Sequence, residues 1–272
     1  MTITTRDQLV SALGNNNSRI VLDKASIASM VTGGFASLWR ATGTPAQGAI
    51  PAASAICNKA LVGAIGFNNQ TSPATSYLAW HTLATGNANT NLEIHDRLAH
   101  MGGLNGTLTT AQTVSLNLAA LGVPAARVGD SNYSDVQWWL EWYTATGATA
   151  SNATVNVTYD DDSTGNLAVI AVGGTVAASR MIPLISAVNG RFIKGVNTIT
   201  LSASTATAGS FGVTATRPRT GMSTILANKL ESFSWQQLGL PEVPNDACLF
   251  GVMLCTTTST GTVRGQAKIA HG

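Results

Sequence analysis

Residues 153–159 read Ala-Thr-Val-Asn-Val-Thr-Tyr, and this stretch decides the fold class. Val155, Val157 and Tyr159 occupy every second position, with polar residues between them. Successive side chains of a strand point to opposite faces of a sheet, so this alternation predicts a β-strand with one buried and one solvated face. Residues 160–166 (DDDSTGN) then predict a turn. A half-buried strand followed by a turn is typical of antiparallel sheet.

Further strands are expected on both sides of this one. They are predicted at 136–143, 167–172, 175–184, 195–202, 210–216, 247–255 and 263–270, with a helix at 223–233 that interrupts the series. About eight short strands at this spacing are typical of an antiparallel sandwich. The sequence therefore predicts a mainly β protein with an α-containing N-terminal region, in which the strands form a jelly-roll-like β-sandwich.

The chain changes character near residue 130. Thr5 and Gln8 have the spacing of a capping box, so a helix is expected from there to Gly14. Further helices are predicted at 24–31, 92–101 and 109–121, and extended arms rich in small residues at 41–54 and 66–76. Two domains are expected: a helical and extended-arm region at 1–130, and the β-sandwich at 131–272.

Charged side chains are scarce. Only 10% of residues are Asp, Glu, Lys or Arg, against about 25% in typical globular domains. The net charge is +2 without a basic run, which disfavours binding to nucleic acid through its phosphates. A surface of Ala, Thr, Ser, Asn and Gly costs little to desolvate. The composition thus favours a subunit that packs against neighbours in an assembly.

Membrane and secretion signals are not expected. No stretch approaches 18 unbroken apolar residues, so we expect no transmembrane helix. The N-terminus has no basic region followed by an apolar core, so it does not read as a secretion signal, and assembly in a cytoplasm is expected.

Motifs for metals and cofactors are not expected either. Asp160, Asp161 and Asp162 have the wrong spacing for an EF-hand, which favours a solvated turn over a calcium loop. His95 and His100 are five residues apart, whereas zinc helices use a spacing of four. The cysteines lack CxxC spacing and are expected to be small buried hydrophobes; they are Cys57, Cys248 and Cys255.

The aromatic strand at 136–143 leaves several interpretations open. An exposed Trp139 or Tyr143 would offer a platform on which sugars stack. The alternative buries Trp138 and Trp142 in the sandwich, with Trp139 and Tyr143 against the N-terminal region or a neighbour. Glu141, beside the indoles, would suit a hydrolase acid only if a second carboxylate lay within about 10 Å.

Residues 4–51, TTRDQLVSALGNNNSRIVLDKASIASMVTGGFASLWRATGTPAQGAIP, resemble N-terminal regions of structural proteins from tailed bacteriophages. The strands after residue 130, rich in Ala, Thr, Gly and Ser, are similar to those of phage decoration, cement and minor capsid proteins. A shell protein should show a long charged spine helix, which is not evident in this sequence. The resemblance therefore implies an accessory head protein, for which no catalytic residue is expected.

The resemblance implies a non-enzymatic capsid decoration or cement protein, located on the capsid surface of a virion that assembles in the host cytoplasm. Its partners would be the major capsid protein and further copies of itself, as a dimer or trimer. The alternative is a receptor- or glycan-binding module of a fibre or spike. Residues 1–130 would make the contacts, and deletion of 1–50 is expected to abolish attachment while the sandwich stays folded. The candidate interface residues are Leu9, Val10, Leu13, Phe35, Trp39, Ile50, Trp139 and Tyr143.

Overall fold

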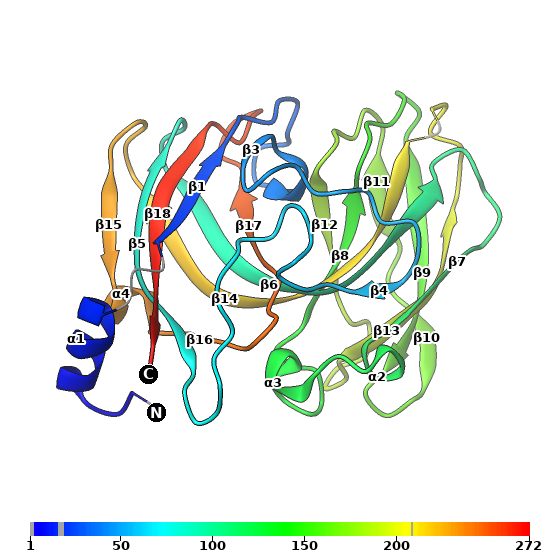
Figure 1. Ribbon diagram of the computed structural model, residues 1–272. Helices are drawn as coiled ribbons and strands as arrows, with labels where there is room; N and C mark the ends of the chain where they lie inside the picture. The colour runs from blue at the N-terminus through cyan, green and yellow to red at the C-terminus, as the bar shows by residue number, and fades with distance from the viewer. Residues whose placement is uncertain (1–2, 16–18, 208) are drawn as a thin grey trace.

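The computed structural model describes residues 3–15, 19–207 and 209–272, and antiparallel β-sheet dominates it (Figure 1). The strands form three sheets. The central sheet contains β2 (Phe35–Ser37), β4 (Ala55–Ile56), β6 (Thr90–Asn105), β8 (Gln137–Trp142), β12 (Arg180–Leu184), β14 (Ser210–Thr224) and β17 (Leu249–Leu254). The expected antiparallel, jelly-roll-like fold class is confirmed.

Six strands of the central sheet close on themselves. The order is β14-β8-β12-β2-β17-β6, and β6 pairs back onto β14 over almost its full length. We call this closed set the six-stranded ring. It has an inner face that its own side chains fill and an outer face on which the other two sheets pack.

A second sheet covers one end of the ring's outer face, and we call it the β5 sheet. It contains β1 (Arg19–Lys24), β3 (Gly43–Thr44), β5 (Ser76–Thr85), β15 (Glu231–Ser234), β16 (Glu242–Val243) and β18 (Val263–His271). Leu22, Leu83, Ile94 and Leu249 are among the residues of the core between this sheet and the ring. Helix α1 (Arg6–Asn15) lies at this end, with Leu9 packed against Ala270 of β18.

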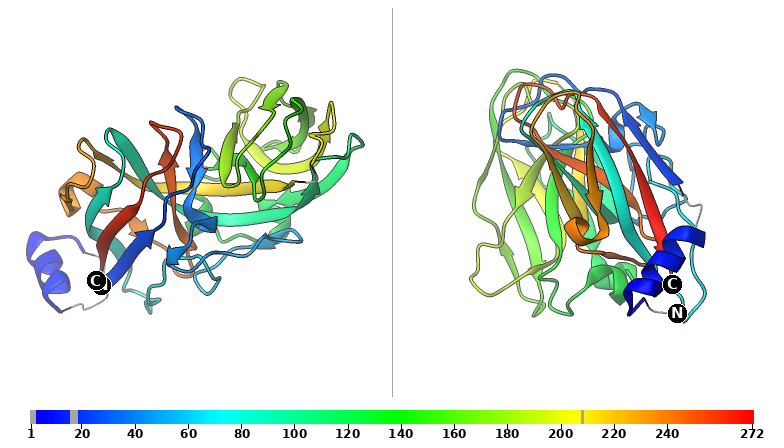
Figure 2. Two further views of the ribbon diagram at one scale, coloured as in Figure 1. Left: turned by 90° about the horizontal axis from the view of Figure 1, so that it is seen from above. Right: turned by 90° about the vertical axis from the view of Figure 1, so that its left-hand side faces the viewer.

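A third sheet, the β9 sheet, covers the other end (Figure 2). It contains β7 (Gln112–Asn117), β9 (Ser151–Tyr159), β10 (Thr164–Asn166), β11 (Ile170–Gly173) and β13 (Ile193–Leu201). Its core is the largest of the protein and holds Leu140, Val155, Ile199 and Phe211. The short helices are η1 (Leu38–Arg40), α2 (Leu118–Leu121), α3 (Ala125–Val128) and α4 (Trp235–Leu238). The molecule is thus two sandwiches side by side, which share the long strands β6 and β14.

The first helix is confirmed with its cap. The backbone N–H of Gln8 donates to Thr5 Oγ1 (3.2 Å), and that of Thr5 donates to Gln8 Oε1 (3.1 Å). The turn after β9 is confirmed as well, because Asp161 Oδ1 accepts from the backbone N–H of Ser163 at 3.1 Å.

Four expected helices are wrong. Residues 92–101 belong to strand β6, and 109–121 contain strand β7 followed only by the single turn of α2. Residues 24–31 form no helix, and 223–233 are the end of β14, a turn and the start of β15. The error at 92–101 has a clear cause: both faces of β6 are buried there, so polar and apolar residues do not alternate in the way a half-buried strand requires.

The strands do not fall into two blocks divided at residue 130. β2 and β6 come before that position, yet they pair within the ring with β12, β14 and β17, which follow it. The structure therefore leads us to expect that a deletion of 1–50 disturbs folding as well as attachment. That deletion removes β1 from the β5 sheet and the buried side chains of Leu22, Leu38 and Trp39.

No helix among the described residues has the length and apolar character to cross a membrane.

Candidate functional site

The inner face of the six-stranded ring is aromatic and charged. In β8, Trp138, Leu140 and Trp142 face outward into the core beneath the β9 sheet. The alternate residues Trp139 and Glu141 therefore face inward, and Tyr143 follows them. Strand β17 supplies Phe250 to the same interior. The interior of the ring thus contains several charged side chains, although the protein has few of them.

Arg97 and Glu141 form an ion pair inside the ring. The distance between Arg97 Nη2 and Glu141 Oε2 is 2.7 Å, and neither side chain is exposed. The guanidinium lies 4.8 Å from the ring centroid of Trp39 and 5.3 Å from that of Phe250, so both aromatic rings stabilise its charge. Tyr143 accepts from Arg97 Nη2 at 3.0 Å. This arrangement holds Arg97 rigidly in place.

Glu141 stays ionised in this environment. Burial by itself would raise the pKa of its carboxyl, but the charge of Arg97 and the hydrogen bonds from Arg97 and Thr214 outweigh it, so the pKa lies below the ordinary value. A hydrolytic acid must hold a proton and reach its substrate. Glu141 is fully buried and ion-paired, so it has a structural position rather than the one the hydrolase hypothesis requires.

Asp96 makes a second set of buried ion pairs. Arg127 of α3 contacts it with two nitrogens, at 3.0 Å to Oδ2 and 2.6 Å to Oδ1. Arg219 Nη2 lies 3.2 Å from Oδ2, and the backbone N–H of Cys248 donates to Oδ1 at 2.8 Å. This carboxylate therefore joins α3, β14 and the segment before β17 to β6.

A chain of hydrogen bonds leads from the interior to the mouth of the ring. Trp139 Nε1 donates to Thr216 Oγ1 at 2.8 Å, and Thr216 Oγ1 lies 3.0 Å from His95 Nδ1. His95 Nε2 lies 2.7 Å from Glu93 Oε2. The hydrogen bond with His95 lowers the pKa of Glu93, against the opposing effect of its partial burial. Glu93 is therefore a carboxylate at the end of this chain, with its side chain 30% exposed.

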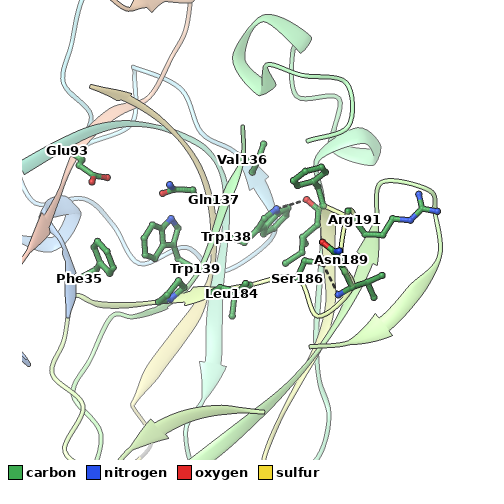
Figure 3. Close-up of a pocket in the computed structure, with 16 residues that line it drawn as sticks. Phe35, Glu93, Val136, Gln137, Trp138, Trp139, Leu184, Ser186, Asn189 and Arg191 are labelled. Atoms are coloured by element: carbon green, nitrogen blue, oxygen red, sulfur yellow. Dashed lines mark hydrogen bonds between the residues drawn. The ribbon is translucent and has the colours of Figure 1, made fainter. Parts of the chain in front are cut away.

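Glu93 lines a pocket of about 540 Å³ at the ring's mouth, which we call the Glu93 pocket (Figure 3). Phe35 and Trp139 lie on the same side of the pocket as Glu93, and Asn189 and Arg191 lie on the opposite side. The volume falls within the range of about 300–1,000 Å³ that is usual for ligand sites. The segment from Ile185 to Val188 contributes two exposed apolar residues to its lining, at 72% and 46% exposure.

The candidate interface residues fall into two groups. Phe35 lines the Glu93 pocket, and Trp39, Trp139 and Tyr143 are buried within or beside the ring. The second group lies on α1, where Leu9 is buried, Leu13 is half-buried and Val10 is exposed; Ile50 is half-buried and stands apart from both groups. Because Trp139 and Tyr143 are only 3% and 2% exposed, the interpretation in which either forms an exposed sugar-stacking platform is wrong, and the alternative that buries them holds.

The residues that sequence reasoning missed are Glu93, His95 and Arg97, which it placed on a helix. A signal was present: four ionisable residues, at 93 and 95–97, stand close together in a chain with few charges. Only strand pairing shows that they belong to a closed ring.

The structure also places the aspartates of the 160–166 turn and the three cysteines. Arg191 lies 2.7 Å from Asp161, and Lys194 lies 2.6 Å from Asp162, so these carboxylates of the turn already have cationic partners. Among the described residues, no group of three or more His, Cys, Asp or Glu side chains could hold a metal ion. The cysteines are buried and free, as expected.

Comparisons with known proteins find only distant likenesses. No family model and no curated protein matches the chain. A solved structure of the Gt strain of infectious bursal disease virus is 9% identical and covers 93% of this chain and 81% of its own, with a TM-score of 0.18. The VP2 subviral particle of that virus is 10% identical and covers 93% and 79%, with a TM-score of 0.17. The chain thus has weak structural similarity to proteins of a viral particle, at scores too low to establish a common fold. The tailed-bacteriophage resemblance stays a prediction.

Proposed function

We propose that this chain is a non-enzymatic structural protein of a virion, attached to the capsid surface as a decoration or cement protein. One observation carries the proposal: the surface has few charged groups, and several of the few that the chain has are placed inside the fold. Asp96, Arg97, Arg127 and Glu141 are buried, although the whole chain has only 13 acidic and 15 Lys or Arg residues. Charged groups are almost never fully buried unless they are paired, and they normally cover the surface.

Among the described residues, twelve large apolar side chains are exposed on the same surface. They are Val10, Val21, Val31, Val62, Leu108, Val169, Ile185, Val188, Ile225, Leu226, Leu230 and Trp235. Interface cores are depleted in charge and rich in apolar and aromatic side chains. A surface of this kind loses little hydration free energy when neighbours cover it. These properties support a subunit that works in permanent contact with a capsid and with other copies.

In this proposal the protein acts by reinforcing the shell mechanically. Each copy would bridge neighbouring capsid subunits, so that rupture of the shell would also have to break these bridges. Many copies on a symmetric shell turn weak individual contacts into strong overall attachment. The partners in this proposal are the major capsid protein and further copies of the chain itself.

The experiment is a binding measurement with the purified chain and empty capsids of its source. We expect saturable co-sedimentation and a capsid that ruptures at a higher temperature when the chain is bound. Val10→Ser on α1 should weaken binding if this helix contacts the shell, with Val169→Ser, on the far side of the molecule, as the matched control. A chain that is absent from purified particles and does not sediment with capsids contradicts the proposal.

A further inference from the structure

Glu93 is a pocket-lining carboxylate that pairs with no Lys or Arg of the described residues. Among the described residues its only ion-pair partner is His95. Because an ionised carboxylate can only accept, His95 Nε2 donates to Glu93, and Thr216 Oγ1 lies between His95 Nδ1 at 3.0 Å and the carbonyl oxygen of Gln137 at 3.4 Å. The mouth of the ring therefore holds one carboxylate without a Lys or Arg partner among the described residues.

The surroundings of Glu93 suit an organic cation on an apolar stem. The partly exposed ring of Phe35 lines the pocket beside it and packs against the buried ring of Trp139, with centroids 5.1 Å apart and planes at 64° (Figure 3). Aromatic faces attract ammonium and guanidinium groups, and a carboxylate strengthens the contact. The exposed side chains of Ile185 and Val188 make the lining apolar, so the occupant should bring apolar surface along with its charge.

The chain itself presents a segment with these properties. The loop between β14 and β15, residues Ile225–Leu230, reads Ile-Leu-Ala-Asn-Lys-Leu. Its apolar residues Ile225, Leu226 and Leu230 are 70%, 55% and 62% exposed. The Lys229 side chain is 58% exposed, and its ion pair with Glu231 at 3.2 Å is a surface contact of the kind that contributes little.

The loop and the pocket lie on different parts of the molecule. The loop leads into β15, the edge strand of the β5 sheet, at one end of the molecule, whereas the pocket lies beside β8 and β12 (Figure 1). An occupied pocket would therefore contain the loop of another copy. Because the two contact surfaces differ, such a contact is heterologous and joins copies head to tail, into a ring or a chain.

We propose that the β14–β15 loop of one copy inserts into the Glu93 pocket of the next. The Lys229 ammonium then lies against the Glu93 carboxylate beside Phe35 and Trp139, and the apolar loop residues cover Ile185 and Val188. This inference names the contact between copies and the residues that make it. It rests on the proposed function only for the claim that the contact forms on a capsid.

The test uses two exposed positions that do not contribute to the folded core. Val188→Lys blocks the pocket with a second cation, and Lys229→Glu places a carboxylate opposite Glu93. Matched controls are Val169→Lys, at a residue that is 65% exposed, and Arg6→Glu on α1, which is also exposed. Sedimentation equilibrium is measured from about 1 μM to about 1 mM, which spans the dissociation constants of weak to moderate contacts.

We expect the wild type and both controls to self-associate with increasing concentration, and each blocking variant to weaken association at least about tenfold. A mixture of the two blocking variants is the decisive sample. Val188→Lys keeps an intact loop and Lys229→Glu keeps an intact pocket, so the mixture should form 1:1 dimers and nothing larger. A Glu93→Gln variant should weaken self-association in the same direction.

Three results would overturn the inference. The wild type could be monomeric across this concentration range, the mixture could form no dimer, or the blocking variants could self-associate as strongly as the controls. If the wild type is monomeric and its pocket binds an added amine such as spermidine, the inference is also overturned, because the occupant is then a small cation and not a second copy. The capsid binding measurement is separate. If the protein binds capsids but does not self-associate, the proposed function stands and the head-to-tail contact is wrong. If it self-associates but does not bind capsids, the head-to-tail contact stands and the proposed function is wrong.

Discussion

At the scale of single residues, the ion pair between Arg97 and Glu141 dominates the interior of the six-stranded ring. Both side chains are fully buried, and Arg97 also contacts His100 and Tyr143. A buried pair of this kind adds little net stability compared with apolar residues of equal volume, but the loss of one partner is costly because a buried charge remains.

Replacement of Glu141 by Gln tests this account. We expect Glu141→Gln to lower the free energy of unfolding by about 3–5 kcal/mol, because Arg97 is left without a counter-charge. Urea unfolding monitored by tryptophan fluorescence measures it. The double variant Arg97→Met with Glu141→Leu should recover a large part of that loss, and a double variant that is less stable than Glu141→Gln would contradict the explanation.

His81 gives the protein a pH dependence. It lies in β5, is 1% exposed, and burial lowers its pKa from 6.5 to about 4. The folded state therefore binds fewer protons than the unfolded state between these values, so stability rises with pH in this window. The contribution of His81 is complete above pH 6.5, falls as the pH is lowered towards 4, and does not fall further below that.

The expected size of this loss is about 3 kcal/mol between pH 7 and pH 4, from the conversion of one pKa unit to about 1.4 kcal/mol. In a His81→Leu variant, the difference in free energy of unfolding between these two pH values should shrink by a similar amount. Parallel pH profiles of variant and wild type, from chemical unfolding at each pH, would show that His81 is not the titrating group.

At the scale of elements, β6 and β14 explain the architecture. They pair along nearly their whole lengths, and their two ends face different cores. Their pairing shifts register at three places, and at some positions the two backbones approach too closely to leave room for a Cβ atom. Gly212 of β14 is one such place, because a Cβ atom there would lie 1.8 Å from the carbonyl oxygen of Met101 in β6.

Gly212→Ala should destabilise the protein by more than about 2 kcal/mol, because a backbone atom, not a flexible side chain, occupies the space. Gly221 is the matched control in the same strand, since a Cβ there meets only Glu93 Cγ, at an ordinary 3.7 Å. Gly221→Ala should change stability by less than about 1 kcal/mol. Thermal unfolding of both variants makes the comparison, and equal effects would refute it.

The β6 strand also shows why local pattern misleads. Leu92, Ile94 and Leu98 belong to the outer cores of the ring, whereas His95 and Arg97 face its aromatic interior. Every residue from Ile94 to His100 is buried, so apolar and charged side chains follow one another without the period of two. β7 has a different cause: its burial does alternate, but the strand is short and runs directly into the single turn of α2.

At the scale of the whole molecule, the N-terminal segments are part of the fold rather than an appendage. β1 pairs with β18, β2 completes the ring, and Trp39 is buried beside Arg97. Helix α1, by contrast, contacts the rest mainly through Leu9. The chain therefore has a dispensable end of about one helix and no independent C-terminal sandwich.

Two deletions separate these statements. Deletion of residues 1–15 should leave a cooperative unfolding transition and cost about 2 kcal/mol, the contribution of one buried leucine. Deletion of 1–50 should abolish cooperative unfolding, because several core side chains at about 2–5 kcal/mol each exceed a total stability of about 5–15 kcal/mol. Circular dichroism with limited proteolysis distinguishes them, and a folded 51–272 fragment would prove the account wrong.

The sequence by itself determined strand β9, the capped first helix and the turn at Asp161, since each depends on neighbours along the chain. It also determined the scarcity of charge, on which the proposed function depends. Only the tertiary structure decided that β6 is a strand, that Glu141 meets Arg97 and that Glu93 lies at the mouth of a closed ring. These features depend on residues far apart in the sequence, such as 93 with 252 and 97 with 141, and no local pattern records which partner a strand will find.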